Sequence, residues 1–251
     1  MSPSGSPSPR SSSRKPLLIS AGVALAAVTL GLVSWQATKP DRGTDSPARS
    51  SAASAPEAGS AKDPAAELKA LARREPGDKL AAGRADAPVV LIEYSDFACG
   101  YCGKFARDTE PELVKKYVED GTLRIEWRNF PIFGADSEAA ARAAWAAGQQ
   151  DRFARFHAAA YAEGAKEKGF GAERLTELAR EAGVPDLERF QADMAGEQAA
   201  AAIRKDREEG YRIGVTSTPS FLINGQPIAG AQPPAAFDAA IAEAKARAAA
   251  Q

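Results

Sequence analysis

The only two cysteines of this 251-residue chain are three positions apart, in the segment FACGYC at residues 97–102. The run at residues 88–94 is short, apolar and rich in β-branched residues, which predicts a buried strand. The segment from residue 103 to about residue 118 has apolar residues at helical spacing and predicts a helix. The pair is therefore expected where a strand passes into a helix, with Cys99 at or just before the helix N-terminus.

This placement favours a reactive Cys99. A helix N-terminus has unpaired N–H groups and the positive end of the helix dipole, which stabilise an anion, and the thiolate is the form that attacks a disulfide. Cys99 is expected at the exposed edge, as the nucleophile with a lowered pKa. Cys102, one turn inside the helix and more buried, is expected to resolve the mixed disulfide by attacking the Cys99 sulfur. Asp96, in the preceding loop, is predicted to be a turn or capping residue.

Half of a zinc site and a purely structural disulfide are the alternative interpretations of the pair. Zinc takes four ligands, but the chain has no second C-x-x-C segment and only one histidine, His157. A C-x-x-C segment near a β-α-β pattern is typical of a redox motif. We therefore expect neither a metal nor a cofactor, and His157, on an aromatic-rich helical segment, is assigned no role.

Residues 214–228 predict a second feature, a β-hairpin near the C-terminus. Its two strands flank Asn224-Gly225, a pair typical of tight hairpin turns, and Pro219 stands at the entry to the first strand. An X-Pro bond adopts the cis form at modest cost. A cis bond at Pro219 would leave the backbone groups of Thr218 free to pair with an extended substrate peptide.

Over roughly residues 75–251 the sequence resembles the DsbA-type thiol–disulfide oxidoreductases of the thioredoxin superfamily. The matching segments are the strand with Glu93, FACGYCGKF at 97–105, WRNFP at 127–131, and GVTSTPSF at 214–221 followed by Asn-Gly. The resemblance implies an α/β fold of the thioredoxin type with an inserted helical domain at about residues 134–212. It also implies that Pro219 is the cis-proline of the family.

The resemblance assigns roles to residues around the pair. Glu93 lies in an otherwise apolar strand, where an isolated buried charge is expensive. An acidic residue at this position in the superfamily passes protons to or from the buried cysteine, and burial raises its pKa toward neutrality. Exposure of Glu93 at the strand end is the alternative. Tyr101, Thr218 and Pro219 are expected to contact the substrate.

Three functions are compatible with these features. The predicted one is an extracytoplasmic oxidase that donates its disulfide to exported proteins and is reoxidised by a membrane partner, as the family implies. An isomerase or reductase is favoured by Gly100-Tyr101, because strongly oxidising DsbA enzymes have Pro-His there, and by Thr218. Isomerases of the DsbC type also have a dimerisation domain, which the low-complexity segment before residue 65 is not expected to form. A non-catalytic peptide-binding module is the third possibility.

The N-terminal region predicts a membrane anchor. Residues 1–16 are rich in Ser and Pro and carry three basic residues without an acid, and residues 17–35 are free of charge and long enough to span a bilayer. Basic residues before the span place that end in the cytoplasm, so the thioredoxin-like domain at residues 65–251 is expected outside it. Residues 36–64 have the composition of a flexible linker. A cleaved signal peptide is the alternative to the anchor.

The rest of the chain predicts one further strand and many helices. Residues 122–127 have the pattern of a strand, the long segment from there to Pro219 is helical in character, and a final helix is expected from residue 234 to about residue 249. The net charge of −1, without a basic cluster after residue 16, gives no indication of a nucleic-acid partner. The expected partners are exported proteins with cysteines, a membrane redox protein, and the membrane itself.

Overall fold

The computed structural model describes residues 64–250. The segments predicted as the cytoplasmic tail (1–16) and the membrane anchor (17–35), and nearly all of the predicted linker, lie outside the described residues. Within residues 64–250, no helix has both the length and the apolar character needed to cross a membrane.

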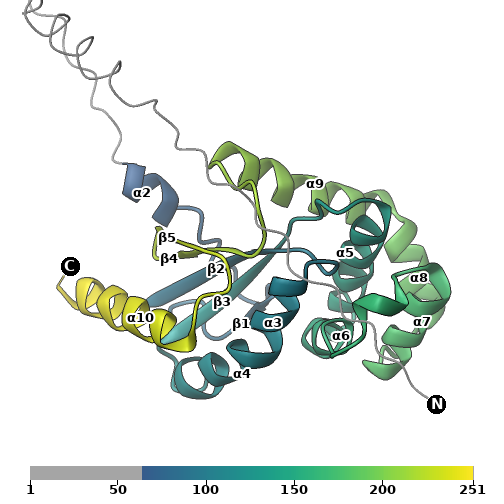
Figure 1. The fold of residues 1–251 in the computed structure, drawn as a ribbon, viewed down its shortest axis with the longest axis horizontal. Coiled ribbons are helices and arrows are strands. Elements are labelled where there is room, and N and C mark those ends of the chain that lie inside the picture. Colours follow the sequence, from purple (N-terminus) through teal and green to yellow (C-terminus); the bar gives the residue numbers. More distant parts are fainter. Residues whose placement is uncertain (1–63, 251) are drawn as a thin grey trace, which may run out of the picture. The chain divides into compact units, whose positions relative to one another are not determined.

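A five-stranded mixed sheet with the order β1-β3-β2-β4-β5 forms the centre of the domain (Figure 1). The strands are β1 (Ala81–Ala82), β2 (Val89–Ser95), β3 (Leu123–Asn129), β4 (Ser220–Ile223) and β5 (Gln226–Ala229). β2 and β3 are parallel, with Glu93 opposite Trp127, and β4 is antiparallel to β2. All residues of β2 and β3 are buried, as expected for central strands covered on both faces. The strands predicted at 88–94 and 122–127 are confirmed.

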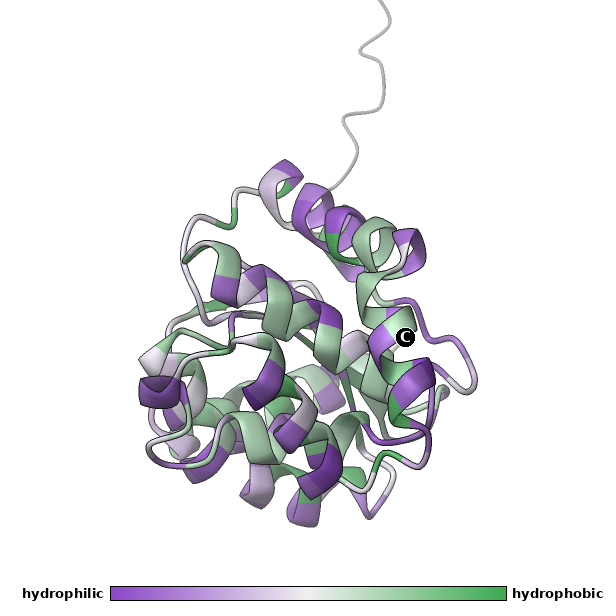
Figure 2. Ribbon diagram, turned by 90° about the vertical axis from the view of Figure 1, so that its right-hand side faces the viewer, coloured by the Kyte–Doolittle hydropathy of each residue, from purple (hydrophilic) through white to green (hydrophobic). Residues whose placement is uncertain are grey.

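Helices cover both faces of the sheet (Figure 1). They are α2 (Pro64–Lys69), α3 (Gly100–Asp108), α4 (Glu110–Leu113), the π-helix η1 (Val114–Val118), α5 (Ala135–Gly148), α6 (Phe153–Ala160), the 3-10 helix η2 (Lys166–Lys168), α7 (Ala172–Glu181), α8 (Leu187–Ala195), α9 (Glu197–Arg212) and α10 (Pro234–Ala249). The predicted final helix is therefore confirmed. Hydrophilic residues, purple in Figure 2, gather toward the periphery of the ribbon.

Alternate residues of β2 enter two separate cores, as the two-residue period of a strand requires. Leu91 packs in the larger core, with Phe105 of α3 and Phe237 of α10. Ile92 and Tyr94 pack in the smaller core on the opposite face, against the segment around α2. Two-residue alternation places Glu93 on the same face as Leu91, which is the face covered by α3.

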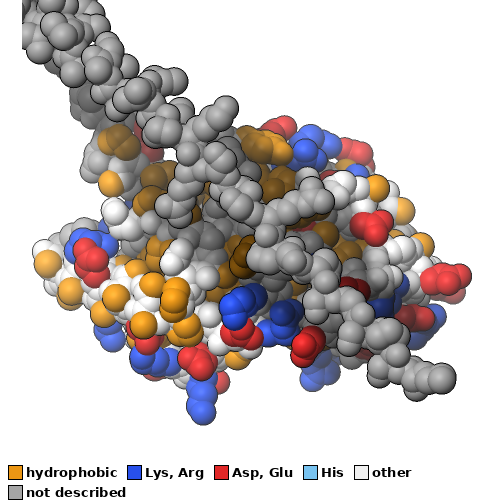
Figure 3. Space-filling model, in the orientation of Figure 1, with side chains coloured by type: hydrophobic (Ala, Val, Ile, Leu, Met, Phe, Trp, Pro, Cys, Tyr) orange, Lys and Arg blue, Asp and Glu red, His pale blue; other side chains and the backbone are white. Residues whose placement is uncertain are grey.

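Between β3 and β4, the chain forms the five helices α5–α9 and the short η2. The alanine-rich α5 lies at the centre of this group and contacts α6, α7, α8 and α9. Most alanines of α5 are fully buried, and their small side chains allow the neighbouring helices to approach closely. On the uncovered part of the face seen in Figure 3, acidic and basic side chains are interspersed.

The helical character predicted from residue 103 to about residue 118 is confirmed, with a break at Thr109 that the pattern did not predict. α3 begins at Gly100, directly after Cys99 as expected, and ends at Asp108. A second helix, α4, starts at Glu110 and passes into the π-helix η1. Pro111 explains the break, because proline has no N–H to donate to the carbonyl of Arg107 four residues earlier, and its ring crowds that carbonyl.

Candidate active site

Asp96 organises the loop that delivers Cys99 to the start of α3. Its Oδ1 accepts a hydrogen bond from the N–H of Ala98 (2.8 Å), and its carbonyl accepts one from the N–H of Cys99 (3.0 Å). Its Oδ2 accepts from the N–H groups of Ile132 (2.6 Å) and Phe133 (3.2 Å), in the loop after β3. Asp96 is thus a turn residue, as predicted, and it also ties together the loops that follow the two central strands.

Cys99 is the N-cap of α3, and both cysteines are thiols in this structure. The Cys99 sulfur accepts a hydrogen bond from the N–H of Cys102 (3.4 Å) and donates its own to the carbonyl of Thr218 (3.3 Å). Of the two backbone groups of Thr218 predicted to be free, the carbonyl is thus engaged by Cys99 while the pair is reduced. The Thr218–Pro219 peptide bond is cis.

Several donors stabilise the thiolate form of Cys99. Hydrogen bonding from the Cys102 thiol, the side chain of Thr218 and the N–H groups of Tyr101 and Cys102 outweighs burial and lowers the Cys99 pKa to about 6. The hydroxyl of Thr218 is buried without a partner in the described chain, so it can turn toward the sulfur. Sequence reasoning attributed only backbone contacts to Thr218 and missed this role of its side chain.

Cys102 has the opposite environment. It is fully buried, and burial, followed by the hydrogen bond to Cys99 and the charges of Cys99 and Glu93, raises its pKa well above the usual value. Cys99 is 5% exposed, so it reaches the surface only through a small opening rather than lying on an exposed edge. The two thiols therefore differ in the way that a nucleophile and a resolving cysteine differ.

The reactivity of Cys99 is expected to follow a single ionisation near pH 6. Below that pH the thiol is protonated, and above it the rate of alkylation by iodoacetamide should reach a plateau, because only the thiolate reacts. Removing the hydroxyl in Thr218→Val should move the midpoint upward by up to about one pH unit, the effect of one hydrogen bond. A midpoint near about 8.5, the value of an ordinary cysteine, would contradict the assigned environment.

Glu93 is fully buried, so the alternative of an exposed strand-end carboxylate is wrong. Neither of its oxygens has a hydrogen-bond partner among residues 64–250. Burial, aided by the charge of Cys99, raises its pKa to about 8, although the polar groups of Ser95 and Trp127 act in the other direction. A carboxyl with this pKa exchanges a proton readily near neutral pH.

The surface around Cys99 combines a cavity with an exposed aromatic side chain. A cavity of about 240 Å³ opens beside Cys99 and is lined by Phe97, Tyr161 and Lys166, among others. Tyr101, between the cysteines, is 69% exposed. The structure therefore brings Cys99, Cys102 and Thr218 into contact and leaves Tyr101 free to meet another molecule.

Two thiols with different pKa values lie at the N-terminus of α3, directly after the central strand β2, and they face the loop with the cis-proline. This arrangement defines a redox-active thioredoxin fold. A family model described as Thioredoxin matches residues 75–243. The probable disulfide bond formation protein D of Bacillus anthracis is 31% identical over 149 residues, which cover 57% of this chain and 68% of that protein.

Two solved structures extend the comparison. A thioredoxin-like oxidoreductase from Silicibacter pomeroyi DSS-3 has 28% sequence identity and a TM-score of 0.59, covering 68% of this chain and 98% of that chain. Oxidised BdbD from Bacillus subtilis has the same fold, with 22% identity, a TM-score of 0.62, and coverage of 67% of this chain and 93% of that chain. The chain therefore belongs to the thioredoxin family, as a DsbA-like thiol–disulfide oxidoreductase.

Proposed function

We propose that the protein is an extracytoplasmic oxidase that transfers its Cys99–Cys102 disulfide to exported proteins with cysteines. The observation that carries this proposal is the stabilised thiolate of Cys99 at the N-terminus of α3. A stabilised thiolate is a good leaving group and favours the reduced form, which makes the disulfide a strong oxidant. The name of the Bacillus anthracis relative, a probable disulfide bond formation protein, supports the same direction.

The reaction proceeds in two exchanges. A substrate thiolate attacks the Cys99 sulfur of the disulfide, forming a mixed disulfide and releasing Cys102 as a thiolate. Cys102 then takes a proton from Glu93, because its buried environment disfavours the charge. A second substrate thiolate attacks the substrate sulfur of the mixed disulfide, which forms the substrate disulfide and releases Cys99 as a thiolate. Reoxidation by a membrane redox partner runs the same steps in reverse.

The substrate contacts are assigned to Tyr101, Thr218 and Pro219. Tyr101 offers an exposed aromatic surface to an extended chain. The carbonyl of Thr218 loses its Cys99 donor when the disulfide forms, and it can then accept a hydrogen bond from the peptide N–H of a substrate. Substrate binding and the oxidised state of the pair are thereby coupled.

Glu93→Gln should slow disulfide opening and closure and should also change how stability depends on pH. Because burial raises the Glu93 pKa to about 8, the folded state holds a proton that the unfolded state releases near pH 4.5. Stability should therefore fall as the pH rises from about 4.5 to 8, by on the order of 5 kcal/mol, and the Gln variant should lose this dependence. Urea denaturation at several pH values measures it. Equal slopes in both proteins would contradict the buried carboxyl.

The membrane anchor is part of the proposal. Residues 17–35 form a charge-free stretch long enough to span a bilayer, following the basic residues of segment 1–16. Together with the linker at 36–64, this would hold the domain of residues 65–251 near the outer surface of the membrane. Fractionation of the full chain with the membrane, resistant to alkaline carbonate, is the expected result; release of a shortened mature protein would favour a cleaved signal peptide.

The reduction potential of the soluble domain tests the direction of electron flow. We would equilibrate it against glutathione buffers and follow tryptophan fluorescence, since Trp127 lies near the cysteines. A potential near about −120 mV, together with faster oxidative folding of a reduced secreted protein, supports the oxidase. A potential near about −270 mV would instead support the reductase or isomerase that Gly100-Tyr101 and Thr218 favour.

A further inference from the structure

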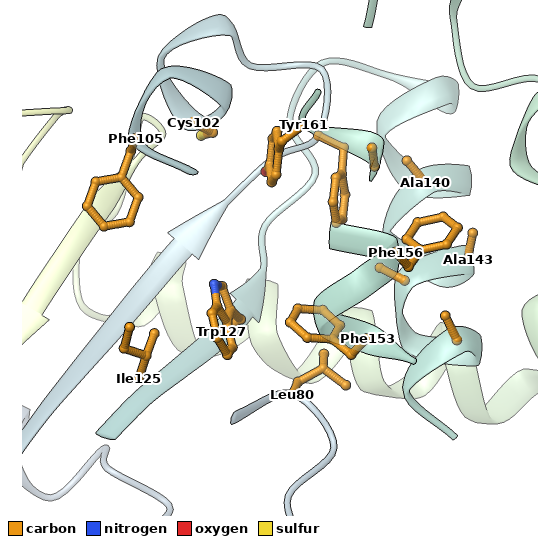
Figure 4. Close-up of a cluster of buried hydrophobic side chains, with 14 of the residues drawn as sticks. Leu80, Cys102, Phe105, Ile125, Trp127, Ala140, Ala143, Phe153, Phe156 and Tyr161 are labelled. Atoms are coloured by element: carbon orange, nitrogen blue, oxygen red, sulfur yellow. The ribbon is translucent and has the colours of Figure 1, made fainter. Parts of the chain in front are cut away.

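A second buried carboxyl lies behind the cysteine pair, on the helix that follows α3. Glu110 of α4 is 8% exposed, and its Oε1 lies 3.8 Å from Nδ1 of His157 on α6. Its Oε2, Nε2 of His157 and Nε1 of Trp127 are all buried without a hydrogen-bond partner within the described part of the chain. Figure 4 shows the indole nitrogen of Trp127 directed toward the end of the sheet where Cys102 and Tyr161 lie.

Trp127 connects the two carboxyls. It stands opposite Glu93 in the pairing of β2 and β3, and its ring centroid lies 5.4 Å from that of His157, whose Nδ1 is next to Glu110. Its indole N–H favours the charged forms of both carboxyls. The negative charge of Glu93 also raises the pKa of Glu110. Glu93, Trp127, Glu110 and His157 therefore form one polar cluster inside the larger core, which we name the buried acid cluster.

Burial decreases from one end of the buried acid cluster to the other. Cys102 and Glu93 have no exposed surface, whereas the side chain of Glu110 is 11% exposed. A carboxyl with no exposed surface cannot exchange a proton directly with water, so the proton that Glu93 gives to Cys102 needs another group for its replacement. Among the cluster residues, Glu110 is the carboxyl that reaches the surface.

We propose that Glu110 is the relay through which Glu93 exchanges protons with solvent, and that His157 positions the Glu110 carboxyl. The inference rests on the proposed roles of Cys99, Cys102 and Glu93. During reoxidation, Glu110 releases its own proton to water and, as a carboxylate, takes up the proton that Glu93 has received from Cys102. During substrate oxidation, Glu93 gives its proton to Cys102 and is reprotonated by Glu110, which regains a proton from water. No electrons move in these steps.

The titratable groups that face Glu110 are suited to this role. On α4 itself, burial and the charge of Glu93 raise the Glu110 pKa well above its usual value, which favours its protonated form. On α6, burial lowers the pKa of His157 to about 3, so its ring is neutral and can accept a hydrogen bond from the Glu110 carboxyl when that group carries its proton. Tyr161, at the end of α6, keeps its proton because burial raises its pKa.

The break between α3 and α4 places Glu110 where it is. Thr109 ends α3 with φ −113° and ψ −48°, and Pro111 follows in the first turn of α4. If α3 continued without a break, residue 110 would face a different side of the helix. Glu112, two residues further on the same short helix, is exposed and serves as a matched control.

The test compares Glu110→Gln with Glu112→Gln in single-turnover oxidation of the reduced full-length protein by oxidised glutathione. Stopped-flow tryptophan fluorescence follows ring closure, and alkylation of Cys99 is measured separately. We expect Glu110→Gln to slow ring closure about tenfold and to alter its pH profile, while Cys99 alkylation and the Glu112→Gln variant stay unchanged. Glu110→Asp, which keeps a titratable group, should recover most of the rate.

Each of the other outcomes shows whether the proposed function or the relay is wrong. If the wild-type protein does not close its disulfide, the proposed function fails, and with it the basis of the relay. If the wild type closes normally and Glu110→Gln matches Glu112→Gln in rate and pH profile, the relay alone is overturned. The same holds if Ser95→Ala, which removes the hydroxyl bonded to Tyr161 (2.9 Å), slows closure while Glu110→Gln does not. Equal slowing by Glu110→Gln and Glu110→Asp would indicate a structural role and would also overturn it.

Discussion

Cys102→Ala should convert the protein into a covalent trap for its substrates, and Cys99→Ala should abolish turnover. Without Cys102, the Cys99 thiolate can still attack a disulfide of a substrate protein and release one substrate thiolate, but the enzyme has no second thiol to expel the bound half, so the mixed disulfide accumulates. Without Cys99, the remaining thiol is fully buried and has a raised pKa, which leaves no accessible thiolate. Non-reducing gel electrophoresis of cells expressing each variant, with mass spectrometry of the adducts, measures both effects.

Cys99→Ala is the control for Cys102→Ala in this experiment, because it has one thiol as well but cannot form the adducts. High-molecular-weight species that disappear on reduction should be found only with Cys102→Ala. If Cys99→Ala forms adducts and Cys102→Ala does not, the roles of the cysteines are reversed. If the Cys99→Ala variant retains function in cells, the protein acts as a peptide-binding module and not as an enzyme.

Arg128→Met should destabilise the domain by about 3–5 kcal/mol, the cost of breaking a buried ion pair on one side. The Arg128 side chain is fully buried and donates from Nε to Glu209 (2.9 Å) and from Nη2 to Glu126 (2.8 Å). It also donates to the carbonyl of Leu71 (3.2 Å). Methionine fills much of the space but removes one cation from each of two buried carboxylates, which leaves Glu126 with Arg124 and Glu209 with the more distant Arg73 (3.4 Å). The free energy of unfolding in urea at pH 7 measures the loss.

The pKa of Glu126 shows how strongly the neighbouring arginines stabilise its charged form. Burial alone would raise its pKa, but hydrogen bonds from Arg124 and Arg128 and from the N–H groups of Arg73 and Arg74 lower it to about 2. The contribution of the lowered Glu126 pKa to the free energy of unfolding is present above about pH 4.5 and is lost as the pH falls through about 2.

A matched surface arginine provides the control for Arg128→Met. Arg84 pairs with Asp86, and both side chains are largely exposed. Arg84→Met should leave the denaturation midpoint unchanged, since water solvates the remaining carboxylate. A second substitution, Glu209→Gln, should recover part of the stability lost in Arg128→Met, because it removes a buried charge that has lost its closest cation. Equal midpoints for the Arg128 and Arg84 variants would show that the buried network contributes little.

Most of the secondary structure around the cysteines could be predicted because its causes are local. The apolar run of β2, the Asn-Gly turn between β4 and β5, and the proline that starts α10 each act within a few residues. Asn224 and Gly225 adopt the positive φ values (46° and 84°) that such a turn requires. The break at Thr109 was also encoded locally, by Pro111, but the apolar spacing from residue 103 to about residue 118 obscured it.

The site was predicted only as a set of residues, not as an arrangement. The pattern of an acid in an apolar strand identified Glu93, and the C-x-x-C segment identified the thiols. Glu110 and His157 were not recognised, because an acid before a proline and a lone histidine on a helix are ordinary surface patterns. Their significance arises from burial, which depends on what α4 and α6 pack against.

The sequence by itself therefore determined the strand–cysteine–helix unit, the hairpin and the helical character of residues 135–212, since hydrophobic period and turn chemistry act over short distances. Only the tertiary structure decided which groups meet. Cys99 lies beside Thr218, 119 positions later, and Arg128 binds Glu209, 81 positions later. The pKa of a thiol or carboxyl depends on its solvation and its neighbours, and a long chain acquires both only when its distant segments pack together.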